Sequence, residues 1–405
     1  MPEDWQRRQH PVQRSSADPE GSIVSIMDAI SKTVHNFSCD LLKEIIKSEP
    51  NKNIFYSPLS IATVLKMVMS GAGGKTKSQM EKVLHVSHEC SSLKECEEDL
   101  QLDIKELLSN QKGKKYELKI VNGLFGDKTF TFKDKYVQLL KNEYNAEYQN
   151  VDFKHNAETE RQKINEWVKC LTNGKITNLY GDGSLDKSSV VALVNAIYFK
   201  GKWANKFNPE NTKEGIFHVN KNEKKTIQMM SQSGKFKFLA LPEVKCKVLM
   251  LPFEEDLCMI IVLPDAIDGL NELLSKATPD LLTTWAQRKN LREKEVDVTM
   301  PKFKLEDSYE LMPTLKKLGM TDLFQENADL SGISSTKGLV LSSFAHKSSI
   351  DVDEAGSEAA AATGVGISVT SLPKRESFTA DHPFMFFLAR SSNFLIFFQG
   401  VLFSP

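Results

Sequence analysis

The order in which helical and strand-like apolar patterns occur is the feature that most restricts the fold of this chain. Over residues 27–172 the apolar side chains recur mainly at helical spacing. From residue 190 onward strand-like apolar runs dominate, including 190–199 and 394–403. Helices and strands do not alternate strictly, as they would in a doubly wound parallel sheet. The pattern therefore predicts an α+β fold.

This periodicity places the expected elements by residue range. The expected helices cover 27–48, 58–70, 79–85, 98–109, 133–145, 158–172, 267–277 and 308–318. The expected strands cover 53–56, 117–126, 190–199, 246–252, 258–263, 295–304, 339–350, 363–371, 384–389 and 394–403. Thr76 and Gln79 form a capping-box pattern at the start of the third helix.

Nothing along the chain divides it into several folded units. No segment of 20–50 residues repeats, and no Pro- and Gly-rich linker follows residue 26. Residues 1–26 are polar and rich in Pro, Ser, Arg and Gln, which is typical of a flexible extension. We therefore expect a flexible N-terminal extension, 1–26, followed by a single domain, 27–405.

Composition and charge exclude several classes of partner. The 52 basic and 53 acidic side chains nearly cancel, so no global charge favours nucleic acid or an anionic membrane. The longest apolar runs are shorter than the roughly 18 residues that span a bilayer. The six cysteines show no short Cys-x-x-Cys spacing, which favours free thiols. Because the N-terminal segment lacks the apolar stretch of a signal peptide, we expect a cytoplasmic protein.

A search for catalytic and cofactor motifs finds no complete one. The chain contains no Gly-x-Ser-x-Gly, no His-Glu-x-x-His and no metal-ligand spacing typical of zinc. Gly74-Lys75-Thr76 resembles the end of a phosphate-binding loop, but Met69 stands where the first glycine belongs. His346 is a lone histidine in a strand-like run, which favours a structural role over a general base. We therefore expect no enzymatic activity, no cofactor and no metal.

The segment 353–376 has the most unusual composition. Its first part contains strong helix formers, so a surface helix or a linker is one interpretation. Read at period two, it instead places small and then β-branched residues on one face: Ser357, Ala359, Ala361, Thr363, Val365, Ile367 and Val369. The segment is thus suited both to an exposed loop and to a half-buried strand.

The same segment also carries a family resemblance. Asp353–Thr363 resembles the hinge of the reactive-centre loop of serpins, and the resemblance extends from Met27 to Pro405. Further matching motifs, in family order, are Asn53–Ser60, Leu193–Trp203, Leu305–Phe324 and Asp381–Phe384. The absence of a signal peptide and the end at Ser404-Pro405 resemble the ovalbumin-like, mostly intracellular branch. The expected location is therefore the cytoplasm, with unconventional secretion as the alternative.

The resemblance implies a fold and a set of site residues. The fold would contain three β-sheets, eight to nine helices and an exposed reactive-centre loop at about 354–380. The loop hinge would comprise Glu354, Gly356, Ser357, Glu358, Ala359, Ala360, Ala361, Ala362 and Thr363, with Ser357 in place of the more usual Thr. A polar cluster beneath the opening point of the main sheet would comprise Ser57, Ser60, Asn195 and His346, with Trp203 near the upper end of that sheet.

The resemblance also implies a function. A monomeric suicide inhibitor would present its loop to a serine or papain-like cysteine endopeptidase and form an acyl-enzyme with it. The hinge would then enter the main sheet as a new strand and distort the protease before deacylation. The alternative is a non-inhibitory protein of the same fold with a chaperone, binding or storage role.

The position of the cleaved bond stays open between two interpretations. The usual family spacing from Glu354 places the bond between Thr370 and Ser371. Thr370 suits a papain-like cysteine protease or an elastase-like serine protease, because apolar Val369 precedes it. Lys374 and Arg375 offer a trypsin-like alternative, although cleavage there would lengthen the inserting segment and favour turnover.

Overall fold

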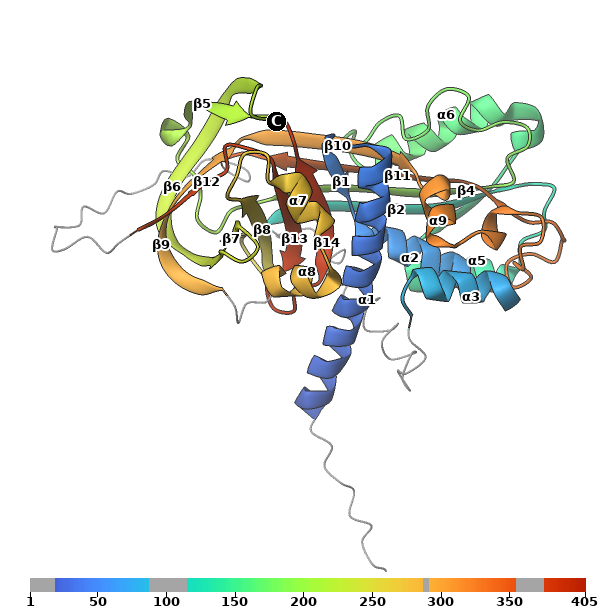
Figure 1. Cartoon of the computed structure of the whole chain (residues 1–405). Coiled ribbons are helices and arrows are strands. Elements are labelled where there is room, and N and C mark those ends of the chain that lie inside the picture. The colour runs from blue at the N-terminus through green and yellow to red at the C-terminus, as the bar shows by residue number, and fades with distance from the viewer. Residues whose placement is uncertain (1–18, 87–114, 287–290, 355–374) are drawn as a thin grey trace, which may run out of the picture.

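Two hydrogen-bonded β-sheets form the framework of the computed structural model, which describes residues 19–86, 115–286, 291–354 and 375–405 (Figure 1). The five-stranded sheet has the order β10 (Phe303–Glu310), β11 (Leu341–Val352), β4 (Val191–Gly201), β2 (Tyr116–Asp127) and β3 (Glu147–Val151). Strands β11 and β4 are parallel, as are β2 and β3, whereas the other two neighbouring pairs are antiparallel.

The second sheet has nine strands. Its main path runs through β1 (Ile54–Tyr56), β14 (Ile396–Leu402), β13 (Phe384–Arg390), β8 (Leu257–Pro264), β7 (Cys246–Pro252), β6 (Lys224–Leu241), β9 (Arg292–Pro301) and β12 (Glu376–Thr379). Strand β5 (Lys213–His218) pairs with β6 outside this path. Strand β6 has 18 residues and pairs with β5, β7 and β9. It therefore joins into one hydrogen-bonded sheet the strands that the resemblance divided between two sheets.

Eight α-helices lie within the described residues. They are α1 (Pro19–Ser48), α2 (Pro58–Met69), α3 (Gly74–Val83), α5 (Asp134–Tyr144), α6 (Phe153–Leu171), α7 (Leu270–Ser275), α8 (Pro279–Ala286) and α9 (Met312–Leu318). Two short 3₁₀ turns, η1 (Pro209–Asn211) and η2 (Asp322–Phe324), complete the set. The α+β architecture predicted from the sequence is therefore confirmed.

Some element boundaries differ from the expectation. Helix α1 begins at Pro19 and not near Met27, so residues 19–26 belong to the helix. Proline is favoured in the first turn of a helix, where its missing N–H costs nothing. In Figure 1 the N-terminal half of α1 extends beyond the rest of the described chain.

The third helix also begins earlier than expected. Helix α3 begins at Gly74, and Gly73 rather than Thr76 occupies its N-cap. Thr76 is buried inside the first turn, where its hydroxyl accepts a hydrogen bond of 2.9 Å from the backbone N–H of Asp329. The capping-box interpretation of Thr76 and Gln79 is therefore wrong.

The strands that the sequence did not predict are mostly half-exposed. In β6 lysines, serines and glutamines interrupt the apolar residues, so no long apolar run marks the strand. Strand β10 occupies the start of the helix expected at 308–318, which begins only at Met312. Strands β3, β5 and β12 and helix α8 were likewise not expected. The helix expected at 98–109 and the strand at 363–371 lie outside the described residues.

The core lies on both faces of the five-stranded sheet. One face, with Leu193 and Phe344, packs in the cluster that also contains the buried side of α2. The opposite face, with Ala192 and Val194, packs against α6. Figure 1 shows α6 on one side of this sheet and α2 on the other. Strands β4 and β11 are therefore buried on both faces. This explains the almost continuous apolar sequence of β4. In β11 the buried residues also include polar ones: His346, Lys347, Ser348 and Ser349.

Candidate functional site

The parallel pairing of β11 with β4 is the centre of the candidate site. The register runs from Leu341 opposite Val191 to Ile350 opposite Phe199, so the two strands are joined along their common length. A segment that follows β11 and turns back would run antiparallel to both strands. Placed between β11 and β4, it would pair in the antiparallel sense with both of them.

A row of polar side chains crosses this strand pair near the middle of its paired length. His346 in β11 lies opposite Asn195 in β4, and Asn195 lies opposite Asn122 in β2. The distance from His346 Nδ1 to Asn195 Oδ1 is 2.6 Å. The Asn195 amide nitrogen donates to Asn122 Oδ1 at 2.7 Å and to Ser60 Oγ at 2.6 Å. The row therefore ties three strands to the helix below them.

The N-terminus of α2 supplies the remaining partners. Ser57 has an extended backbone and caps the helix, because its hydroxyl accepts the Ser60 N–H at 3.2 Å. The Ser57 hydroxyl in turn donates to the carbonyl of Phe397 in β14 at 2.6 Å. The Ser57 N–H donates to His346 Nε2 at 3.2 Å. The structure thus places Ser57, Ser60, Asn195 and His346 in one connected network.

These contacts decide the protonation of His346. Because Nε2 accepts a hydrogen bond from Ser57, the ring proton must lie on Nδ1, which then donates to Asn195. Complete burial lowers the pKa of His346 to about 3. The imidazole is therefore neutral and fully hydrogen-bonded, which is the environment of a structural histidine and not of a general base.

Two members of the row were not found by sequence analysis. Asn122 falls inside an apolar strand run, where its only signal is a polar residue at a core-facing position. Tyr309 in β10 lies opposite His346 in the register, with ring centroids 6.4 Å apart and an angle of 18° between the rings. The polar row therefore extends over four strands.

Trp203 lies apart from this row, beyond the upper end of β4. Its ring is buried and stacks on Phe253, with centroids 4.3 Å apart. Its Nε1–H donates to the carbonyl of Asp353, just after β11, at 2.8 Å. Lys200 of β4 adds ion pairs of 2.7 Å to Asp353 and 3.3 Å to Asp351. These contacts form a second tie between the two strands.

The described chain reaches both ends of the expected reactive loop. The Glu354 carboxylate pairs with Lys302 at 2.9 Å, and its carbonyl accepts the Phe207 N–H at 3.1 Å. At the other end, Arg375 pairs with Asp297 at 3.4 Å. The remaining expected loop residues lie outside the described residues: Gly356, Ser357, Glu358, Ala359, Ala360, Ala361, Ala362, Thr363, Thr370, Ser371 and Lys374.

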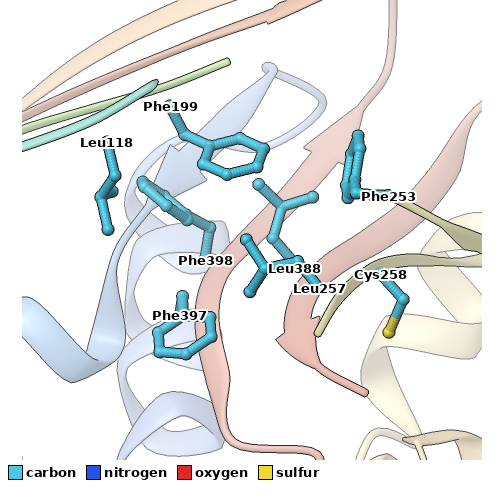
Figure 2. Close-up of a pocket in the computed structure, with 8 residues that line it drawn as sticks. All are labelled: Leu118, Phe199, Phe253, Leu257, Cys258, Leu388, Phe397 and Phe398. Atoms are coloured by element: carbon cyan, nitrogen blue, oxygen red, sulfur yellow. The ribbon is translucent and has the colours of Figure 1, made fainter. Parts of the chain in front are cut away.

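A small apolar cavity lies between the two sheets (Figure 2). Its lining residues are Leu118, Phe199, Phe253, Leu257, Cys258, Leu388, Phe397 and Phe398. Its volume of about 10 Å³ is roughly that needed for one water molecule, and its walls offer no polar surface. This cavity is a packing gap and not a site for a small-molecule substrate.

The described residues contain no group of three or more side chains that could hold a metal ion. Among the described helices, none is both long and apolar enough to cross a membrane.

Comparison with known proteins identifies the family. The family model for serpins, described as serine protease inhibitors, matches residues 32–405. This chain is a member of the serpin family. Human serpin B3 is 42% identical over 391 residues, covering 94% of this chain and all of that protein. Bovine leukocyte elastase inhibitor is 43% identical over 384 residues, with the same coverage. Both belong to the ovalbumin-like branch, as the motifs indicated.

Solved structures show the same fold in other serpins. Uncleaved ovalbumin superposes with a TM-score of 0.85 at 32% identity, covering 93% of this chain and all of ovalbumin. Human thyroxine-binding globulin, solved with its hormone, superposes with a TM-score of 0.84 at 30% identity. That match covers 94% of this serpin and 99% of the globulin. The serpin fold inferred from the sequence is therefore confirmed.

Two buried histidines make the stability of this serpin depend on pH. Burial lowers the pKa of His346 to about 3 and that of His35 to about 4, whereas the ordinary value is 6.5. The unfolded chain therefore takes up protons first as the pH falls, so the stability present above pH 6.5 is progressively lost below it. Each histidine should reduce the free energy of unfolding by about 1.3 kcal/mol between pH 7.5 and 5.5.

Urea unfolding at the two pH values measures this loss. We expect His35→Gln, which keeps a donor for the Phe394 carbonyl that His35 contacts at 3.2 Å, to lose about half as much stability as the wild type on acidification. The wild type, measured in the same buffers, provides the reference. An unchanged pH dependence in His35→Gln would contradict the assignment.

Proposed function

We propose that this serpin is a protease inhibitor of the suicide-substrate type and not an enzyme. The observation that carries the proposal is the closed parallel pair of β11 and β4, with the start of the reactive loop attached directly to the end of β11. Relatives named as elastase inhibitors, at 40–43% identity, support it. The proposal covers monomeric action on a serine or papain-like cysteine endopeptidase.

The chemistry belongs to the protease. Its hydroxyl or thiol attacks the carbonyl carbon of Thr370, and the proton of that nucleophile passes to the departing nitrogen. The bond between Thr370 and Ser371 breaks, Ser371 leaves with a free amino group, and Thr370 remains as an ester or thioester on the protease. Water would complete turnover by hydrolysing this acyl bond. Inhibition requires the cleaved loop to move before that hydrolysis.

Insertion between β11 and β4 provides the driving force for that movement. One parallel ladder would be replaced by two antiparallel ladders, which are slightly more stable per residue. One face of the entering strand would also be buried, against the core that contains α2. Small residues followed by Val365, Ile367 and Val369 on one face suit such a position.

The segment after the cleaved bond is attached elsewhere. Strand β12 pairs in parallel with β9, and Glu376 forms an ion pair of 2.8 Å with Lys294. Lys247 donates to the Ser377 carbonyl at 3.3 Å. After cleavage the β12 side would therefore stay in place, while the side attached to β11 is free to move with the protease.

The same attachments support Thr370 as the reactive residue. Arg375 is ion-paired with Asp297 and directly precedes Glu376, which already pairs with Val296 in the sheet. A protease that cleaved after Arg375 would have to bind residues that belong to the β12 ladder. Cleavage after Thr370 leaves several residues between the bond and that ladder. We therefore propose a papain-like cysteine protease or an elastase-like serine protease as the target.

A cytoplasmic location is part of the proposal. The described cysteines, Cys39, Cys170, Cys246 and Cys258, form no disulfide with one another. Burial raises the pKa of the Cys39 and Cys246 thiols to about 12, which makes them unreactive. Free thiols in this number are typical of a reducing compartment.

One experiment tests the proposed function. The protein is incubated with elastase-, cathepsin- and trypsin-like proteases, and a covalent complex that survives boiling in detergent is sought by gel electrophoresis. The melting temperature of the loop-cleaved protein is compared with that of the intact protein, and mass spectrometry identifies the cleaved bond. Complex formation and a marked rise in melting temperature are expected. Clean cleavage without either would instead favour a non-inhibitory role, as in the hormone-bound globulin.

Ser357→Arg should separate cleavage from trapping. Ser357 begins the face that must enter the core, and an arginine there would bury an unpaired charge. We expect loop cleavage at the wild-type rate but at least ten times less covalent complex. Glu358→Arg is the matched control, because the same side chain replaces a charged residue on the opposite face. If Ser357→Arg still traps protease as the wild type does, the proposed register is wrong.

Substitution at the two candidate bonds should identify the reactive residue. We expect Arg375→Ala to leave the complex with an elastase- or cathepsin-like protease unchanged. Thr370→Arg should create a complex with a trypsin-like protease that the wild type traps poorly. Complex yield and the mass of the released C-terminal fragment measure both effects. Loss of all complexes in Arg375→Ala would assign the reactive bond to Arg375.

A further inference from the structure

Ser349 is the one buried serine among the described residues whose hydroxyl finds no hydrogen-bond partner there. It lies in β11, directly opposite Tyr198 of β4 and Glu306 of β10. The preceding Ser348 is equally buried, with 0% exposure, but faces the other side of the sheet. Its hydroxyl donates to the Phe55 carbonyl at 2.6 Å. The two neighbouring serines therefore differ in the face that they occupy and in whether the hydroxyl has a hydrogen-bond partner.

Ser349 lies between the two ties that join β11 to β4. On its N-terminal side in β11, His346 is hydrogen-bonded to Asn195. On its C-terminal side, Asp351 is ion-paired with Lys200. No side-chain hydrogen bond of Ser349 connects the strands between these points. An opening that begins at the upper end of β11 would meet Ser349 before it reaches the central row.

Lys347, the preceding residue of β11 on the same face as Ser349, shows that this face offers hydrogen-bond partners. Lys347 points to the α6 side of the sheet, where it donates to the Thr177 carbonyl at 2.7 Å and pairs with Glu306 at 2.8 Å. Polar side chains on this face can thus reach the segment after α6 and the adjacent strand. The Ser349 hydroxyl reaches neither and is buried without compensation, which destabilises the state that buries it.

We propose that Ser349 facilitates the opening of the β11 and β4 pair. Its unpaired hydroxyl destabilises the closed sheet at the point between the two ties. When β11 moves away from Tyr198, water or the backbone of an entering strand can satisfy that hydroxyl. Ser349 therefore acts as a positioning residue that speeds strand entry relative to deacylation. This inference rests on the proposed inhibitory function.

Ser349→Ala tests the inference, with Ser348→Ala as the matched control. Melting temperatures are measured for the intact and the loop-cleaved forms of each variant, together with the number of inhibitor molecules consumed per protease trapped. Ser349→Ala should raise the melting temperature of the intact form by about 1–3 °C and leave that of the cleaved form unchanged. It should also consume at least twice as many inhibitor molecules. Ser348→Ala should lower the melting temperature of the intact form.

The outcomes distinguish the inference from the function on which it rests. If the cleaved wild type gains no stability, insertion does not occur, and both proposals fail. If the wild type inserts but Ser349→Ala shifts the intact and cleaved forms equally, the effect is general and only the inference about Ser349 is overturned. An unchanged or lower melting temperature of intact Ser349→Ala would overturn it as well.

Discussion

The rest of this structure depends on the parallel pairing of β11 with β4. Parallel neighbours in one sheet leave room for an antiparallel strand between them, provided that the ladder joining them can break. Here the ladder is reinforced at two heights, by the His346 and Asn195 contact and by the contacts of Asp353. The core packs on both faces of this pair, with α2 on one side and α6 on the other.

Sequence reasoning predicted the architecture well because apolar periodicity decides which elements are buried. It predicted β4, β8 and β14 within a few residues, since each is an almost continuous apolar run. It missed β6 because a half-exposed strand of lysines and serines has no such run. It placed the start of α1 too late, because polar residues at the beginning of an amphipathic helix resemble a flexible segment.

The candidate site was less accessible to pattern reasoning than the fold. The periodicity of the sequence identified His346 as structural, but its grouping with Ser57 and Asn195 came from the family resemblance and not from spacing. Asn122 and Tyr309 join the row only through strand register, which brings together residues distant in the sequence. Register between non-sequential strands depends on long-range packing, and a single sequence carries little information about it.

The proposed inhibitory mechanism requires a closed sheet that later opens, and such a sheet needs strong and weak points in particular places. The neutral, fully hydrogen-bonded His346 stabilises the middle of the pair, where premature separation would admit the loop without a protease. The ion pairs of Lys200 at the upper end are partly exposed and therefore less costly to break. Ser349 adds a buried but unpaired group between them. The separation of β11 from β4 is therefore easiest when it starts at the C-terminal end of β11 and proceeds toward His346. The loop is attached at that end and would arrive from the same direction.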